Sequence, residues 1–260
     1  MKGTYVYCIG RSRKRPSALR SPAGLPGATR PEIAGAGDGL WLVLAEVPLD
    51  TYGSEHLEAR LPDLDWVGRV ALAHEAVVEH FVSQPGLAVV PMKLFTMFSS
   101  HDRAIAEISR RRTRIEAAAR RIAGAEEWGI RIMRSAADGR SAAGRTATAG
   151  IVSGAAFLAA KKHARDAARS ASVAAAESAL EAYERLAALS RDVRRRNDTP
   201  ASVTTPPLLD AAFLVPADKR ARFKAAAKRE AARCAKAGAE LILSGPWPAY
   251  NFVETGSNPQ

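Results

Sequence analysis

Cysteine is nearly absent from this chain, since only Cys8 and Cys234 occur in 260 residues. The two lie far apart and in no spacing typical of a metal or redox site, which excludes a disulfide framework and a structural zinc site. So sparse a use of cysteine fits a reducing compartment. We therefore expect a cytoplasmic protein without disulfides or bound metal.

Long apolar runs are missing as well. No segment approaches the ~18 uninterrupted apolar residues of a membrane span. The short apolar run after Lys2 is followed by the basic stretch 11–15, which is the wrong order for a secretory signal. The sequence thus predicts a soluble protein that stays inside the cell and has no membrane partner.

Aromatic and acidic residues are both scarce. Aromatic residues make up 6% of the chain, and 27 Asp and Glu stand against 38 Lys and Arg, a formal net charge of +11. Alanine fills much of the apolar share, which indicates a core that is thin in places. The positive charge favours an acidic partner, which could be nucleic acid, an anionic membrane or an acidic protein surface.

The alternative of a basic protein that associates with nucleic acid depends on two stretches, the helix around Arg110–Arg121 and the run Arg191–Arg196. Stacking of bases needs aromatic side chains near the arginines, and none occurs between Phe98 and Trp128. Nucleic acid is therefore disfavoured as a partner, although phosphate contacts without base recognition stay open.

Two motif-like stretches fail when their spacing is examined. His74 is followed by Glu75, but the zinc-protease motif needs a second histidine where Val78 stands. The glycines of 139–146 have the spacing of a phosphate-binding P-loop, but Arg145 replaces the lysine and the loop continues. No catalytic set remains, so we expect no enzyme and no cofactor, and a structural role for His74.

Hydrophobic patterning predicts an α+β fold with two compact α+β domains joined by a long Ala-rich helix. A ferredoxin-like arrangement is expected in at least the N-terminal domain. The predicted strands of that domain are 4–9, 40–47, 87–98 and 126–133, and its helices begin at Asp63 and at Ser99 or Ser100. The C-terminal domain is predicted as one long helix or two broken ones from 153 to about 196, a strand at 208–215, a helix at 218–236 and a strand at 240–243. The predicted boundaries are an N-terminal domain at 1–135 with a mobile loop at 10–39, a linker at 136–152, a C-terminal domain at 153–253 and a disordered tail at 254–260.

The stretch 241–253 combines an apolar strand with two prolines and three aromatics. Pro246 and Pro248 fix φ and remove backbone donors, so they forbid a helix and exclude all but edge pairing in a sheet. The aromatics carry too much apolar area to remain in water, so this stretch is expected to dock. It could form a lid over its own core, a surface for a partner, or both. The three aromatics are Trp247, Tyr250 and Phe252.

Four segments stand out in order along the chain. They are Tyr5–Ile9 (YVYCI), Val89–Phe98 (VVPMKLFTMF), Glu126–Ile132 (EEWGIRI) and Ser244–Phe252 (SGPWPAYNF). Together they bracket nearly the whole chain and resemble motifs of the gas vesicle accessory proteins of the GvpF/GvpL family. Phe95 stands where that family usually has glycine, which argues against a tight turn at this point.

The resemblance implies an accessory protein that helps to form the gas vesicle, as an assembly factor or a minor vesicle component, and not an enzyme. It implies the small shell subunit and other accessory proteins as partners, and the cytoplasm and the gas vesicle as locations. Shell subunits expose apolar surface before they polymerise, so an assembly factor should offer aromatic or Ala-rich faces together with charge. The candidate partner-binding residues are Trp247, Tyr250, Phe252 and Lys93, and the long helix is a further candidate surface.

Overall fold

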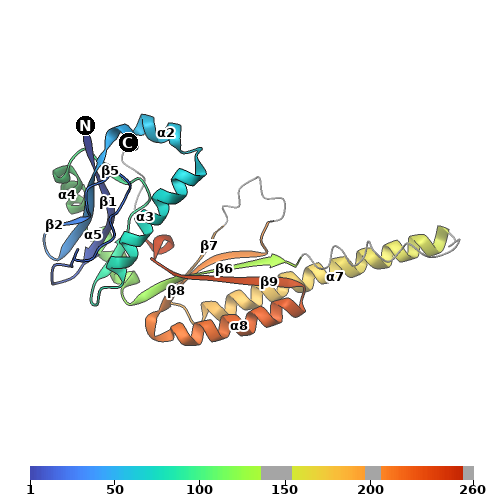
Figure 1. The fold of residues 1–260 in the computed structure, drawn as a ribbon. Helices are drawn as coiled ribbons and strands as arrows, with labels where there is room; N and C mark the ends of the chain where they lie inside the picture. Colours follow the sequence, from blue (N-terminus) through green and yellow to red (C-terminus); the bar gives the residue numbers. More distant parts are fainter. Residues whose placement is uncertain (136–153, 197–205, 254–260) are drawn as a thin grey trace. The chain divides into compact units, whose positions relative to one another are not determined.

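The computed structural model describes residues 1–135, 154–196 and 206–253 (Figure 1). This part of the chain is an α+β protein with two antiparallel sheets and helices. It divides into two compact units, the first made of residues 1–126 and the segment that begins at Trp247, the second of residues 127–246. The predicted linker 136–152 and tail 254–260 lie outside the described residues.

The first unit is built on a sheet in which β1 is central. Its strands are β1 (Lys2–Arg11), β2 (Glu32–Gly35), β3 (Leu40–Pro48), β4 (Ala88–Pro91) and β5 (Met97–Phe98). Their order is β2-β3-β1-β4, β5 also pairs with β1, and each of these pairings is antiparallel. The strands predicted at 4–9 and 40–47 are confirmed as β1 and β3, and they pair with each other, with Tyr5 opposite Ala45.

The segment between β1 and β3 contains a strand that the sequence did not indicate. A mobile loop is predicted over 10–39, but Glu32–Gly35 pairs with β3 as the edge strand β2. Leu25 of this segment is buried, and its N–H donates to the Tyr7 hydroxyl at 3.0 Å. A strand of four residues has little propensity of its own, and the ladder that β3 offers decides its conformation.

The helices of the first unit are α1 (Leu49–Tyr52), α2 (Ser54–Arg60), α3 (Leu64–Val82), α4 (His101–Arg110) and α5 (Arg112–Ile122). Both predicted caps are confirmed, since Asp63 Oδ1 accepts from the Trp66 N–H at 3.0 Å and Ser100 Oγ from the Arg103 N–H at 3.2 Å. The single helix predicted after Ser100 is interrupted at Arg111, whose φ of −93° and ψ of 10° leave helical geometry.

The second unit contains β6 (Ala125–Arg134), α7 (Gly154–Ala187), β7 (Asp192–Arg195), β8 (Leu209–Pro216), η1 (Ala217–Lys219), α8 (Arg220–Lys236) and β9 (Ala239–Trp247). Its strand order is β7-β8-β6-β9. The strand predicted at 126–133 therefore does not close the first domain but lies between β8 and β9, where the Ile132 carbonyl accepts from the Leu208 N–H at 2.8 Å. The first part of the first unit accordingly ends at Glu126 rather than at residue 135.

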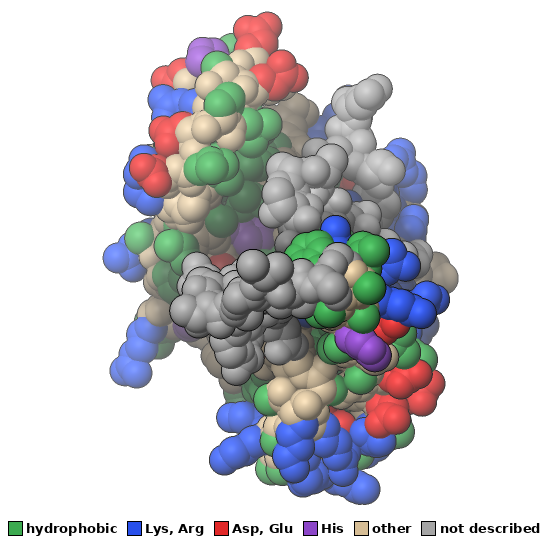
Figure 2. Space-filling model, turned by 90° about the vertical axis from the view of Figure 1, so that its right-hand side faces the viewer, with side chains coloured by type: hydrophobic (Ala, Val, Ile, Leu, Met, Phe, Trp, Pro, Cys, Tyr) green, Lys and Arg blue, Asp and Glu red, His purple; other side chains and the backbone are tan. Residues whose placement is uncertain are grey.

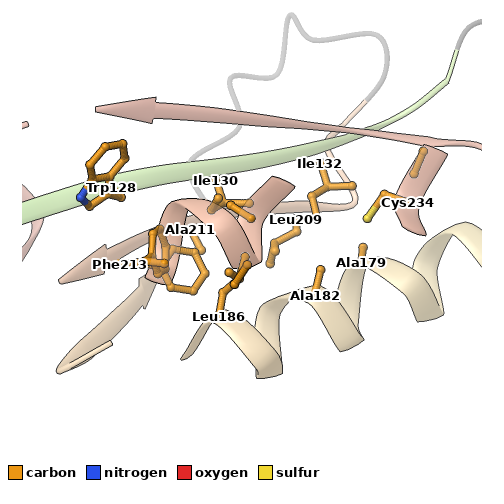
Figure 3. Packing of buried hydrophobic residues seen from close by; sticks show 14 of the residues in the cluster. Trp128, Ile130, Ile132, Ala179, Ala182, Leu186, Leu209, Ala211, Phe213 and Cys234 are labelled. Carbon is orange, nitrogen blue, oxygen red and sulfur yellow. The ribbon is translucent and has the colours of Figure 1, made fainter. Parts of the chain in front are cut away.

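The long helix α7 lies entirely within the second unit and does not join the two units as predicted. It also ends at Ala187 rather than near residue 196, because the chain turns there and continues as β7. At its C-terminal end Ala182 and Leu186 face the sheet, opposite residues such as Ile130 and Phe213 (Figure 3). Alanine lets the helix approach the sheet closely, so the large side chains of the strands supply most of the buried area.

Candidate functional site

The C-terminal stretch belongs to the core of the first unit. Residues 248–253 follow β9 and contain the 3-10 turn η2 (Tyr250–Phe252), which is closed by donation from the Phe252 N–H to the Ala249 carbonyl at 3.1 Å. Phe252 is fully buried, and Pro248 and Ala249 are buried with it. The stretch thus docks on the core of the first unit, and not on the C-terminal domain 153–253 to which the sequence assigned it.

Tyr250 is held by a carboxylate of α3. Its hydroxyl donates to Glu75 Oε2 at 2.7 Å. Burial, followed by the negative charge of Glu75, raises the pKa of Tyr250 well above its ordinary value, so the phenol stays protonated and remains the donor. The ring of His74 lies 6.3 Å from that of Tyr250. Tyr250 is therefore an anchor of the C-terminal stretch.

His74 is enclosed by two tyrosines of β1. Tyr5 Oη lies 2.7 Å from His74 Nδ1, and the Tyr7 ring stacks on the imidazole with 5.7 Å between ring centroids. Burial lowers the pKa of His74 to about 4, against the opposing effect of a backbone hydrogen bond at Met92. The imidazole is therefore neutral at pH 7 and fills the structural role predicted for it. Burial also raises the pKa of the Cys8 thiol, which removes thiolate chemistry there.

Trp247 and Lys93 are the candidate residues that remain exposed. Trp247 is the last residue of β9, and 45% of its surface is accessible although Pro248 next to it is buried. Lys93 is exposed on the turn between β4 and β5, and no hydrogen bond or ion pair within the described ranges joins it to the C-terminal stretch. The structure thus places the three aromatics on one segment, with Trp247 the one that presents a large apolar surface, and leaves Lys93 on a separate turn.

Phe95 lies in a tight turn, although a phenylalanine in place of glycine predicts that no tight turn forms there. The predicted strand 87–98 is split into β4 and β5, and the Lys93 carbonyl accepts from the N–H and the hydroxyl of Thr96, at 3.2 and 2.7 Å. Phe95 has φ of +64°, the left-handed conformation that favours glycine. Its ring stacks on Trp66 at 5.9 Å, and its N–H donates to Tyr5 Oη at 3.3 Å. These contacts stabilise the turn, although the left-handed backbone conformation of Phe95 is itself unfavourable.

Glu75 is the residue of this site that sequence reasoning missed. It was considered only as part of a metal motif with His74, and that motif fails. Its actual partner, Tyr250, lies 175 positions further along the chain, and no local pattern reports a pair so distant. The available signal is a carboxylate next to His74, a histidine for which the sequence predicts a structural role.

The arginines of α4 and α5 are largely engaged by carboxylates. Figure 2 presents another face, the right-hand side of the view in Figure 1, where charges of both signs occur and Lys and Arg gather at the lower end. Arg114 and Arg121 also have interaction partners. A surface neutralised in this way offers few free cations to a phosphate backbone. The ion pairs are Arg110 and Arg111 with Glu107, Arg112 with Asp38 and Glu116, and Arg120 with Glu116.

Neither a metal cluster nor a membrane-spanning helix occurs among the described residues. Across residues 1–135, 154–196 and 206–253, no three side chains able to bind a metal ion lie together. In those ranges no helix combines the length and the apolar character needed to cross a bilayer. The glycine-rich stretch 139–146 lies outside the described residues.

Comparison with known proteins gives a consistent result over the whole chain. Residues 3–254 match the family described as gas vesicle synthesis protein GvpL/GvpF. Gas vesicle protein L from Streptomyces sp. (strain CB03234) is 30% identical over 130 residues, which are 49% of this chain and 46% of that protein, so the match spans about half of each.

Two crystal structures share the fold. The gas vesicle protein GvpF from Anabaena sp. PCC7120 superposes with a TM-score of 0.66 at 13% identity, over 99% of this chain and 100% of that one. GvpF from Microcystis aeruginosa gives a TM-score of 0.59 at 13% identity, over 97% and 99% of the two chains. At such identity the similarity establishes the fold alone.

Proposed function

Because this chain belongs to the gas vesicle synthesis protein family GvpL/GvpF, we propose that it is an accessory protein needed for vesicle formation. In this role it binds the small shell subunit and other accessory proteins during assembly, in the cytoplasm and at the growing vesicle. Members of the family are gas vesicle proteins rather than enzymes. A binding function needs surfaces that persist in the folded protein and meet a partner without rearrangement.

The observation that carries the proposal is the contrast between Trp247 and its neighbours. Pro248, Ala249 and Phe252 are buried and Tyr250 is tied to Glu75, so the segment is fixed, while 45% of the Trp247 surface remains accessible. An aromatic ring on a fixed backbone loses little entropy on contact, and tryptophan is enriched among residues that dominate binding energy. Trp247 is thus the proposed apolar contact for a shell subunit, and Lys93 a second, polar contact.

We further propose a ferredoxin-like arrangement, and for the second unit rather than the first. The order of elements along the chain is β6, α7, β7, β8, α8 and β9, which is strand, helix, strand, strand, helix, strand. The sheet order β7-β8-β6-β9 supports this proposal, since the first strand of the unit lies between the third and the fourth.

The test is co-purification of the tagged protein with the co-expressed small shell subunit, with nuclease present and over a series of salt concentrations. Trp247→Ala is expected to lower the retained shell subunit at least about tenfold, because the ring is lost while the buried anchor residues stay. Retention that survives nuclease and high salt would support an apolar contact. Retention that Trp247→Ala leaves unchanged would overturn this assignment.

Two further variants separate binding from folding. Leu72→Ala removes another exposed apolar side chain, 73% accessible, and is expected to bind as the wild type does. Phe252→Ala empties a fully buried site and is expected to cost about 3–5 kcal/mol of unfolding free energy, seen by urea denaturation. If Trp247→Ala were as destabilising as Phe252→Ala, Trp247 would be part of the lid and not a contact.

A further inference from the structure

None of the described residues buries the side chains in the N-terminal half of α7. The helix has 34 residues, and those from Ala155 to Ala171 are all exposed, whereas Ala175, Ala179 and Ala182 further along are buried against the unit. In Figure 1 this half extends beyond the sheet and α8. Helices in folded proteins gain most of their stability from packing of one face, so an exposed helical half of this length would be stabilised by a partner.

One stripe of this half continues the face by which α7 packs on its own unit. At 3.6 residues per turn its members align with the buried residues Ala175, Ala182 and Leu186. The stripe is exposed, and its one large member, Phe157, is 63% accessible. Further along, the same side of α7 meets α8, where Ser178 Oγ lies 3.6 Å from Cys234 Sγ. The members of the exposed stripe are Phe157, Ala160, Ala164, Ala168 and Ala171.

A row of cations borders this stripe on one side. Lys161, Arg165 and Arg169 follow one another at four-residue spacing and are exposed. Lys162 adds a further positive charge, and Asp166 is the single acidic residue between 154 and 172. Two copies of this half pairing with each other would bring like charges together, which disfavours self-association. The charge therefore selects an acidic occupant.

We propose that the exposed half of α7 is a docking surface for an amphipathic helix of a partner protein, one that carries acidic residues along one edge. The packing of α8 on α7 is the precedent within this molecule, since small residues meet there and the Glu230 carboxylate of α8 pairs with Arg185 of α7 at 2.9 Å. An occupant helix continues that interface, with its apolar face on the alanine stripe and its acidic edge along the cationic row. The identity of the protein that supplies the helix rests on the proposed function, but the surface itself does not.

The test uses the full-length protein and two fluorescent synthetic peptides of about 20 residues. Both peptides are amphipathic helices with the same Leu and Ala face, one edged with Glu and the other with Lys. Fluorescence anisotropy is expected to show that the Glu-edged peptide binds at least about tenfold more tightly, because only that edge complements the cationic row. Equal affinity for both peptides, or no binding of either, would overturn the proposal.

Variants locate the surface. Ala164→Glu with Ala168→Glu places charge in the stripe and is expected to abolish binding of the Glu-edged peptide, with helicity unchanged by circular dichroism because Glu is a good helix former. Ala159→Glu with Ser170→Glu makes the same change in charge on the opposite side of the helix and should leave most of the binding intact. Lys161→Glu with Arg165→Glu and Arg169→Glu is expected to reverse the preference between the peptides.

Two results would assign this face differently. A dimer detected by light scattering and dissociated by Ala164→Glu with Ala168→Glu would make a second copy the occupant and overturn the proposal. Binding of duplex DNA that competes with the Glu-edged peptide and depends on the cationic row would do so too. Peptide binding without co-purification of the shell subunit would leave this inference standing and count against the proposed function.

Discussion

Phe95 is the residue whose backbone is most at odds with its side chain. Its φ of +64° costs an L-residue roughly 1–2 kcal/mol relative to glycine, and the stacking on Trp66 offsets that cost. Phe95→Ala removes the ring but keeps the backbone cost, whereas Phe95→Gly removes both. We expect the Gly variant to be more stable than the Ala variant, with a free energy of unfolding about 1 kcal/mol higher in urea denaturation. A Gly variant that is no more stable than the Ala variant would show that the turn carries no strain.

His74 makes the stability of the first unit depend on pH. Burial lowers its pKa from 6.5 to about 4, so the stability that the neutral imidazole contributes is complete above pH 6.5 and is lost as the pH falls toward 4. A shift of this size corresponds to roughly 3 kcal/mol. His74→Gln cannot titrate. Between pH 6.5 and pH 4 its unfolding free energy is therefore expected to fall less than that of the wild type, by a difference of up to roughly 3 kcal/mol. Parallel stability curves for the two proteins would contradict this expectation.

The two tyrosines beside His74 do not titrate in that range. Burial raises the pKa of Tyr7 to about 12 and that of Tyr5 above its ordinary value as well, so both stay protonated from pH 4 to pH 8. Their hydroxyls therefore stay neutral throughout, and Tyr7 Oη can go on accepting from the Leu25 N–H. A pH effect that His74→Gln removes can thus be assigned to the imidazole.

At the scale of elements, α7 and α8 are joined by a buried carboxylate with two cations. The Glu230 side chain is 4% exposed, its Oε2 lies 2.9 Å from Arg185 Nη1, and its Oε1 accepts from Arg233. Either arginine alone keeps the carboxylate paired, so Arg185→Ala or Arg233→Ala is expected to cost about 1 kcal/mol. The double variant leaves a buried charge unpaired and should cost about 3 kcal/mol or more.

The measurement is a double-mutant cycle by chemical denaturation. The cost of the double variant is expected to exceed the sum of the single costs. The matched control repeats the cycle with Glu230→Gln, in which the coupling should largely vanish because no buried charge remains. Additive costs in the wild-type background would mean that the two arginines act independently of Glu230.

Elements with a strong local signal could be predicted from the sequence, and their partners often could not. The caps Asp63 and Ser100 are read from residues within one turn of the helix, and both are confirmed. The strand β6 was predicted as an element but assigned to the wrong sheet, because alternation of apolar residues specifies a buried face and not a neighbour. The edge strand Glu32–Gly35 was missed, since its four residues depend on β3 for their conformation.

The candidate site shows the same limit. The prolines and aromatics of the C-terminal stretch predict that it docks, and the burial of Phe252 agrees. That Tyr250 anchors on Glu75 and that Trp247 stays exposed depend on contacts between distant parts of the chain. Whether Trp247 and Lys93 meet a partner remains a prediction, which the co-purification experiment addresses.

At the scale of the whole molecule, the net charge of +11 should give weak binding to nucleic acid without sequence preference. Because the arginines of α4 and α5 are paired with carboxylates, these two helices can neutralise few phosphates at once. On a duplex DNA column we expect the logarithm of the affinity to fall with the logarithm of salt concentration with a slope magnitude below about 3. A slope of about 6 or more, or a preference among duplexes, would revive the nucleic-acid alternative.

The chain leaves the first unit after Glu126 and re-enters it at Trp247, so the second unit is synthesised before the first is complete. On the ribosome, Glu75 and the core around it are made first, and Tyr250 and Phe252 become available only after all of the second unit has been translated. A nascent chain that halts in between lacks the buried Phe252 side chain, and chaperones and proteases recognise such an incompletely filled core. The first unit can therefore be completed only after the second has been synthesised, so a truncated product is marked for removal.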